Sequence, residues 1–140
     1  MVTVGSTVNA VVDNSVAIAW AYPKQRDAYA ERLLKQLYDV RFHVPSLWPT
    51  EFVNATSMLV NRGHMSTEMG AEMIGLGASF GFSVDGNPVD MEALFEIGQR
   101  FKLTAYDAAY LELAIRLNAP LATRDRELTK AAKQLKLYFS

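Results

Sequence analysis

Short runs of β-branched and apolar residues alternate with helical stretches along most of the chain. The runs predict strands at Val8–Val12, Phe42–Val44, Phe82–Val84 and Pro120–Thr123, with Leu137–Phe139 as a candidate edge strand. Apolar periodicity predicts helices at Ser15–Tyr22, Asp27–Tyr38, Leu47–Arg62, Ser66–Phe80, Pro88–Phe101, Thr104–Leu117 and Arg126–Gln134. Strands that alternate with helices pair in parallel, so we expect an α/β fold with a short, mainly parallel sheet of four to five strands and helices on both faces.

Length and composition narrow the class of protein. With 140 residues, 50% of them hydrophobic and 21% charged, the chain fits one globular domain, and we expect residues 1–7 to be a disordered or non-native leader. The absence of cysteine excludes a disulfide scaffold, an iron–sulfur site, a thiolate zinc site and a cysteine nucleophile. The sequence shows no signal peptide and no apolar run of the roughly 20 residues that would span a membrane, so we expect a cytoplasmic protein.

Four acidic residues occupy comparable places in this pattern. Asp13 directly follows the first predicted strand, and Asp125 follows the fourth. Glu51 and Asp107 lie in the first turns of their helices. In a parallel sheet, strand ends and helix starts meet at one edge, so these residues can share a crevice. Each alone could instead cap a helix or complement its dipole, and only the functional interpretation requires all four to converge.

Clustered carboxylates repel one another, and they must either take up protons or bind a cation. Oxygen ligands favour Mg²⁺ or Mn²⁺, and the chemistry that uses such a site is phosphodiester hydrolysis. We assign no catalytic role to His43 or His64, and no serine–histidine–aspartate arrangement competes with the acids. The formal net charge of −1 means that a nucleic-acid substrate would be attracted by metal ions and a local basic patch.

The segments around the acids resemble those of PIN-domain proteins. The resemblance is carried by Val11-Val12-Asp13-Asn14-Ser15, Val44-Pro45-Ser46-Leu47 leading into Glu51-Phe52-Val53-Asn54-Ala55, Leu103-Thr104-Ala105-Tyr106-Asp107-Ala108-Ala109-Tyr110-Leu111, and Ala119-Pro120-Leu121-Ala122-Thr123-Arg124-Asp125. It runs from about Val8 to the end of the chain and is nearest to the VapC-type toxins of toxin–antitoxin modules.

The resemblance implies an α/β/α sandwich and a Mg²⁺- or Mn²⁺-dependent endoribonuclease. It also implies that Asp13, Glu51, Asp107 and Asp125 are the catalytic, metal-binding acids. Ser15 and Thr123 match small hydroxyl positions that often support the site in this family, and Asn54, one turn after Glu51 on the same helix face, could orient a ligand or a water, although packing or capping would explain all three equally well. A cognate antitoxin protein and a homodimer are the implied partners, with groove walls at Trp20–Tyr22, Asp27–Tyr38 and Leu47–Arg62. The helices Ser66–Phe80 and Asp107–Leu117 are expected to contribute to the dimer.

Basic and aromatic residues near the acids suggest how RNA would approach. Lys24, Arg124 and Arg126 are candidate contacts for RNA phosphates, although they could equally belong to solvated helix faces. Trp20, Tyr22, Trp48 and Tyr106 could stack bases, but both tryptophans fit a core or interface position better.

Two other classes of function remain open at this point. One is a non-catalytic module of the PIN fold that binds RNA or protein. The other is a phosphate-accepting signalling domain, which also places acids at strand ends but normally pairs acids before the acceptor. The run Asn9-Ala10-Val11-Val12-Asp13 lacks such a pair.

Overall fold

The computed structural model describes residues 8–140, and the expected leader at residues 1–7 lies outside the described part. Within residues 8–140, four strands form one sheet: β1 (Val8–Val12), β2 (Val40–Val44), β3 (Ser83–Val84) and β4 (Leu121–Ala122). Their order is β3-β2-β1-β4, and every neighbouring pair is parallel. The parallel sheet expected from the alternation of strands and helices is therefore confirmed.

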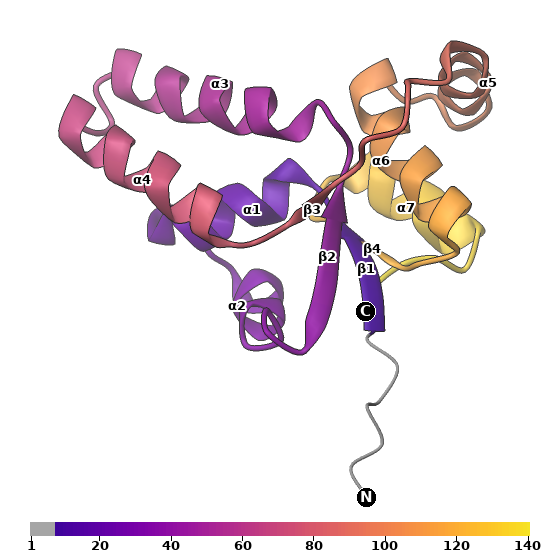
Figure 1. Cartoon of the computed structure of the whole chain (residues 1–140), viewed down its shortest axis with the longest axis horizontal. Coiled ribbons are helices and arrows are strands. Elements are labelled where there is room, and N and C mark those ends of the chain that lie inside the picture. The colour runs from indigo at the N-terminus through magenta and orange to yellow at the C-terminus, as the bar shows by residue number, and fades with distance from the viewer. Residues whose placement is uncertain (1–7) are drawn as a thin grey trace, which may run out of the picture.

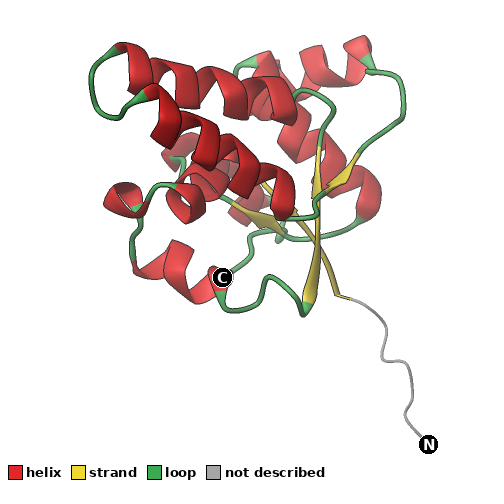
Figure 2. Cartoon of the chain, turned by 60° about the vertical axis from the view of Figure 1, so that its left-hand side comes forward, coloured by secondary structure: helices red, strands yellow, loops and turns green. Residues whose placement is uncertain are grey.

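The helices lie in two groups on the two sides of this sheet (Figure 1). The helical elements are α1 (Asn14–Ala21), the 3₁₀ turn η1 (Pro23–Gln25), α2 (Ala28–Leu34), α3 (Trp48–Asn61), α4 (Thr67–Ser79), α5 (Met91–Phe101), α6 (Ala105–Leu117) and α7 (Arg126–Gln134). Helices α1 to α4 lie on one side and α5 to α7 on the other, and Figure 2 shows the short strands between them. The arrangement is an α/β/α sandwich.

The core is built on the central strand β1. Ala10, Val11 and Val12 are fully buried because helices cover both faces of the sheet, which explains the uninterrupted apolar run in the sequence. On the α1 side, the Trp20 ring meets the Phe42 ring of β2 edge-on, with 5.3 Å between centroids. Trp20 therefore belongs to the core, as its sequence context favoured.

Glycines in α4 let this helix pack closely against α3. A Cβ atom at Gly77 would lie 2.4 Å from Cε1 of Phe52, and one at Gly70 would lie 2.7 Å from Cγ2 of Val60. Glycine lowers intrinsic helix propensity, which weakened the sequence prediction here. The expected helix forms nevertheless, because the missing side chains allow a close contact between the two helices.

Two helices are shorter than the sequence predicted. Helix α2 ends at Leu34 rather than at Tyr38, because the chain continues in tighter turns that begin with the hydrogen bond from the Gln36 amide to the Leu33 carbonyl. Helix α5 begins at Met91 rather than at Pro88. Asp90, the residue before α5, caps the helix because its side chain accepts a hydrogen bond from the Ala93 amide.

The candidate edge strand Leu137–Phe139 forms only an isolated parallel bridge, between Leu121 and Tyr138. Its potential partner β4 is two residues long, so Leu121 alone exchanges backbone hydrogen bonds with the segment. The sheet therefore has four strands within residues 8–140, at the lower end of the expectation. No helix in the described part of the chain is long and apolar enough to cross a membrane.

Candidate active site

Four acidic side chains lie where the strands of the sheet end. Asp13 follows β1 and caps α1, and Asp125 follows β4 and caps α7. Glu51 lies in the first turn of α3, which follows β2, and Asp107 lies in the first turn of α6. The capping roles considered for Asp13 and Asp125 are therefore real, and they place both carboxylates at the carboxyl edge of the sheet.

Asp13 is held by three hydrogen bonds and is 4% exposed. Its Oδ1 accepts from the Ser15 hydroxyl at 2.6 Å and from the Val16 amide at 3.2 Å. Its Oδ2 accepts from the Thr123 hydroxyl at 2.5 Å. Ser15 and Thr123, the two hydroxyl residues singled out in the sequence, thus both contact this carboxylate and fix its orientation.

Burial raises the pKa of Asp13 from its ordinary value of 3.8 to about 6. The hydrogen bonds from Ser15, Thr123 and Val16 lower this pKa but do not outweigh the loss of solvation, and repulsion from Asp107 raises it further. The ionised form of Asp13 is therefore destabilised in the folded protein, and a nearby cation would stabilise it.

Glu51 is bound by a tyrosine from another helix. The Tyr110 hydroxyl of α6 donates to Oε1 of Glu51 at 2.5 Å, and Tyr110 is 1% exposed. Burial raises the pKa of Glu51, while this hydrogen bond lowers it. Burial and the charge of Glu51 also raise the pKa of the Tyr110 hydroxyl, so the phenol stays protonated and remains a donor.

Asp107 connects the four acids electrostatically. Burial is the main cause of its raised pKa, followed by repulsion from Asp125 and then from Glu51. Asp107 in turn raises the pKa of Asp13. Asp107 therefore interacts electrostatically with each of the other three acids, and their convergence on one metal site remains a prediction.

The donor set suits a hard divalent cation, because carboxylate oxygens are the ligands that Mg²⁺ and Mn²⁺ favour. Within residues 8–140, however, no three acidic, histidine or cysteine side chains lie close enough together to hold one metal ion. Both observations hold, because Coulomb repulsion reaches much further than direct coordination. Asp13, Glu51, Asp107 and Asp125 are the residues that would hold the ion, and a closed ligand set remains a prediction.

Comparison with known families identifies this arrangement. The family model of the PIN domain matches residues 10–134, which is most of the chain. The chain belongs to the PIN-domain family. PIN domains are generally nucleases, and PIN-domain nucleases usually use divalent metals, in agreement with the carboxylate donors of this site. No curated protein sequence matches this PIN domain.

The fold of this PIN domain is also found in a solved structure. The crystal structure of PAE2754 from Pyrobaculum aerophilum is similar with a TM-score of 0.70, over 92% of this chain and 87% of that chain. The two sequences are 23% identical. At this level of identity the likeness establishes the shared fold.

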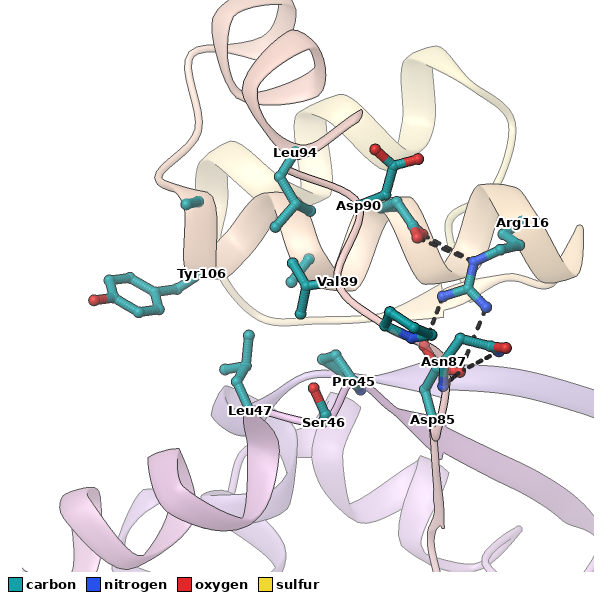
Figure 3. A pocket seen from close by; sticks show the side chains of 14 residues that line it. Pro45, Ser46, Leu47, Asp85, Asn87, Val89, Asp90, Leu94, Tyr106 and Arg116 are labelled. Atoms are coloured by element: carbon teal, nitrogen blue, oxygen red, sulfur yellow. Dashed lines mark hydrogen bonds and ion pairs between the residues drawn. The ribbon is translucent and has the colours of Figure 1, made fainter. Parts of the chain in front are cut away.

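One hollow of this PIN domain contains an acid of the site, and a second hollow shares part of its lining. One, of about 440 Å³, is lined by Leu47, Thr50, Glu51, Asn54 and Tyr106. The other, of about 190 Å³, is more enclosed and lies between the start of α3, the start of α5 and one face of α6 (Figure 3). None of the four acids lines this second cavity.

Sequence reasoning missed Tyr110, whereas the capping box that the sequence indicates at Thr104-Ala105-Tyr106-Asp107 is confirmed. Tyr110 binds Glu51, and the Thr104 hydroxyl accepts from the Asp107 amide at 3.2 Å and so caps α6. Tyr110 lies three residues after Asp107, on the same face of the helix. A tyrosine at that spacing from a candidate metal ligand was the available signal.

Other expected site residues take different places. The Asn54 amide donates to the sulfur of Met58 at 3.7 Å rather than to one of the acids, although Asn54 lines the same hollow as Glu51. The Arg124 guanidinium donates to the carbonyls of Ser15 and Gln25 and to a carboxylate of the α2 cap. Because most of its donors are used within the protein, Arg124 holds α1 in place and is poorly available to RNA.

Exposure separates the remaining candidates for RNA contact. Lys24 and Arg126 are exposed, as a phosphate contact requires. Trp20 and Trp48 are buried and cannot stack a base, whereas Tyr106 is 66% exposed. Tyr22 is half-buried and lines a separate hollow with Met69 and Leu76. Tyr106, beside Asp107, is therefore the candidate aromatic platform at the acids.

Proposed function

We propose that this PIN domain is a Mg²⁺- or Mn²⁺-dependent endoribonuclease that acts as the toxin of a type II toxin–antitoxin pair. The observation that carries the proposal is the group of four acids at the carboxyl edge of the sheet, linked by repulsion through Asp107. Burial and mutual repulsion of carboxylates lower the stability of the folded protein. Carboxylates with pKa values shifted in this way are typical of functional sites. Membership of a family of nucleases supports hydrolysis of a phosphodiester bond.

The residues of the chain have distinct roles in this proposal. A divalent ion bound by the acids would supply an activated water and neutralise charge at the phosphate. Ser15 and Thr123 hold Asp13 in one orientation, and Tyr110 does the same for Glu51. These contacts preorganise two of the ligands before metal or substrate arrives.

The partners are proposed on the same basis. Exposed Lys24 and Arg126 would contact RNA phosphates on either side of the acids. An antitoxin would lay an apolar helix against α1, α2 and α3 and cover the site. The homodimer expected from the family resemblance remains a prediction, as does the cytoplasmic location expected from the sequence.

Cleavage of labelled RNA by the purified protein tests the proposal. We expect cleavage with Mg²⁺ or Mn²⁺, none with EDTA, and a loss of more than about 100-fold in Asp107→Asn, because the metal supplies several kcal/mol of transition-state stabilisation. Asp39→Asn, which changes an exposed carboxylate away from the site, should cleave like the unaltered protein. Equal cleavage by Asp107→Asn and the unaltered protein would show that another group or a contaminant is responsible.

One observation favours a second candidate, a non-catalytic PIN module that binds RNA or protein. It is the lack, within the described residues, of three acids close enough to share an ion. This candidate predicts that RNA is bound and released intact with or without Mn²⁺. Metal-dependent cleavage that disappears in Asp107→Asn would exclude it.

A further inference from the structure

The enclosed cavity beside the acids is a formed pocket of defined size and chemistry. Its volume is about 190 Å³, below the roughly 300 Å³ at which pockets for drug-sized ligands begin. Leu47 of the turn before α3 and Leu94 of α5 point toward one another across it, and Val89 lies between them (Figure 3). A narrow apolar space of this size suits one small ring system rather than a larger ligand.

The cavity borders the hollow that contains Glu51. Leu47 and Tyr106 line both the cavity and the hollow that contains Glu51. Tyr106 directly precedes Asp107, and its ring points outward at the mouth of the cavity (Figure 3). A nucleotide whose phosphate lies at the acids would therefore have its neighbouring base beside this mouth.

Ion pairs centred on Arg116 hold one wall of the cavity in place. The Arg116 guanidinium of α6 binds Oδ2 of Asp85 at 2.6 Å and Oε1 of Glu112 at 3.0 Å. Its Nε, Nη1 and Nη2 all donate within this group, which ties the segment after β3 to α6. The wall is thus already formed, and both of these carboxylates are paired with Arg116.

The charged side chains that line the cavity are mostly acidic: Asp85, Asp90 and Glu112, against the single guanidinium of Arg116. Oδ1 of Asp90 accepts from the Ala93 amide at 3.0 Å, and because Asp90 is exposed its carboxylate is also accessible to a ligand from solvent. Asp90 and the hydroxyl of Ser46 both line the cavity. An acidic acceptor repels phosphate but binds the amino group of a base.

We propose that this cavity binds an unpaired, amino-bearing base (adenine, guanine or cytosine) next to the phosphate that is cut. The inference rests on the proposed ribonuclease function and names a determinant of its sequence specificity. RNA-binding proteins read unpaired bases in this way, by stacking on aromatic rings and by hydrogen bonds to base edges. Tyr106 supplies the ring, the apolar walls enclose the base, and Asp90 accepts from its amino group.

Cleavage of RNA with a degenerate sequence, followed by sequencing of the fragment ends, tests the proposal. Val89→Trp fills the cavity from an exposed position, and Met91→Trp is the matched control, since Met91 is 80% exposed and does not line the cavity. We expect the unaltered protein and Met91→Trp to share enrichment of an amino-bearing base at one position beside the cut. Val89→Trp should reduce this enrichment about 5-fold or more, as expected for loss of recognition of one base, while still cutting RNA.

Asp90→Asn adds a test of hydrogen bonding, because asparagine keeps the helix cap but replaces one acceptor oxygen with a donor. It should weaken the preference for the amino-bearing base and raise the share of uracil. The proposal is overturned if Val89→Trp keeps the preference of the unaltered protein, if the preferred base is uracil, or if no position is selective.

Failure of the proposed function is distinguishable from failure of the pocket. If no variant cuts RNA, NMR titration with adenosine, guanosine, cytidine and uridine 5′-monophosphates still tests the pocket. Saturable shifts at Leu47, Val89 and Tyr106 that disappear in Val89→Trp but persist in Met91→Trp would support it. The absence of such shifts for every nucleotide, or equal shifts in both variants, would overturn it.

Discussion

Replacement of Asp13 by asparagine should make the metal-free protein more stable while abolishing its activity. The ordinary pKa of 3.8 and the value of about 6 in the folded protein, at roughly 1.36 kcal/mol per pH unit, correspond to about 3 kcal/mol. This is the cost of keeping the buried carboxylate ionised at neutral pH. Asparagine stands in for the protonated acid, since its oxygen accepts from Ser15 and Val16 and its amide donates to the Thr123 oxygen.

The sign of the pH dependence follows from proton binding. Between pH 3.8 and about 6 the folded protein holds the Asp13 proton more tightly than the unfolded chain, so the contribution of Asp13 to stability falls as pH rises through this window. We expect Asp13→Asn to exceed the unaltered protein by about 3 kcal/mol near pH 8 and by only about 0.5 kcal/mol near pH 4. Urea unfolding in EDTA, followed by tryptophan fluorescence, measures both gaps.

The control for this experiment is Asp39→Asn, at an exposed carboxylate. Its stability should follow that of the unaltered protein across the same range of pH. If Asp13→Asn is no more stable than the unaltered protein near pH 8, or if the gap does not narrow toward pH 4, Asp13 does not carry an electrostatic cost and the reasoning is wrong.

Further predictions concern the tyrosine at the site and the glycines of α4. Tyr110→Phe removes the hydroxyl that donates to the half-buried Glu51 and should cost about 1–3 kcal/mol in urea unfolding, together with a slower rate of RNA cleavage. Gly77→Ala should cost about 1–3 kcal/mol, because its Cβ would overlap the Phe52 ring. Gly75→Ala meets nothing within 4 Å and should instead stabilise the helix by about 1 kcal/mol, so equal melting shifts in the two alanine variants would contradict the packing described for α4.

Tyr29→Phe is the matched control for the tyrosine. The Tyr29 hydroxyl donates to the Phe139 carbonyl at 2.6 Å, and not to any of the four acids. Its loss should lower stability but leave the rate of cleavage by the folded protein unchanged. A similar loss of cleavage in both variants would mean that Tyr110 acts only through stability.

The parts of the fold that depend on local sequence were predictable. The three residues before Asp13 are all apolar, as a strand that is buried on both faces requires. Two of the acids directly follow strands, and the other two lie in the first turns of helices. The rule that parallel strands end at one edge then places these acids together. Helix ends were less predictable, because α5 begins where Asp90 finds an amide to cap rather than where Pro88 permits a start.

The parts of the site that depend on distant residues were not predictable. Thr123 reaches Asp13 across 110 positions of sequence, and Tyr110 reaches Glu51 across 59. Spacing along the chain does not reveal such contacts, and neither does it show how far side chains stand from one another. The sequence therefore indicates which acids share the edge, but not that no three of them gather around one point within residues 8–140.

Calorimetric titration of Mn²⁺ into the purified protein tests most directly whether the four acids form a metal site. We predict saturable binding to the unaltered protein and to Asp39→Asn. Asp107→Asn should bind Mn²⁺ at least about 10-fold more weakly, because a loss of this size is expected even when a residue that only supports a metal ligand is replaced. Absence of binding to the unaltered protein, or equal affinity in Asp107→Asn, would contradict the assignment of the acids as metal ligands.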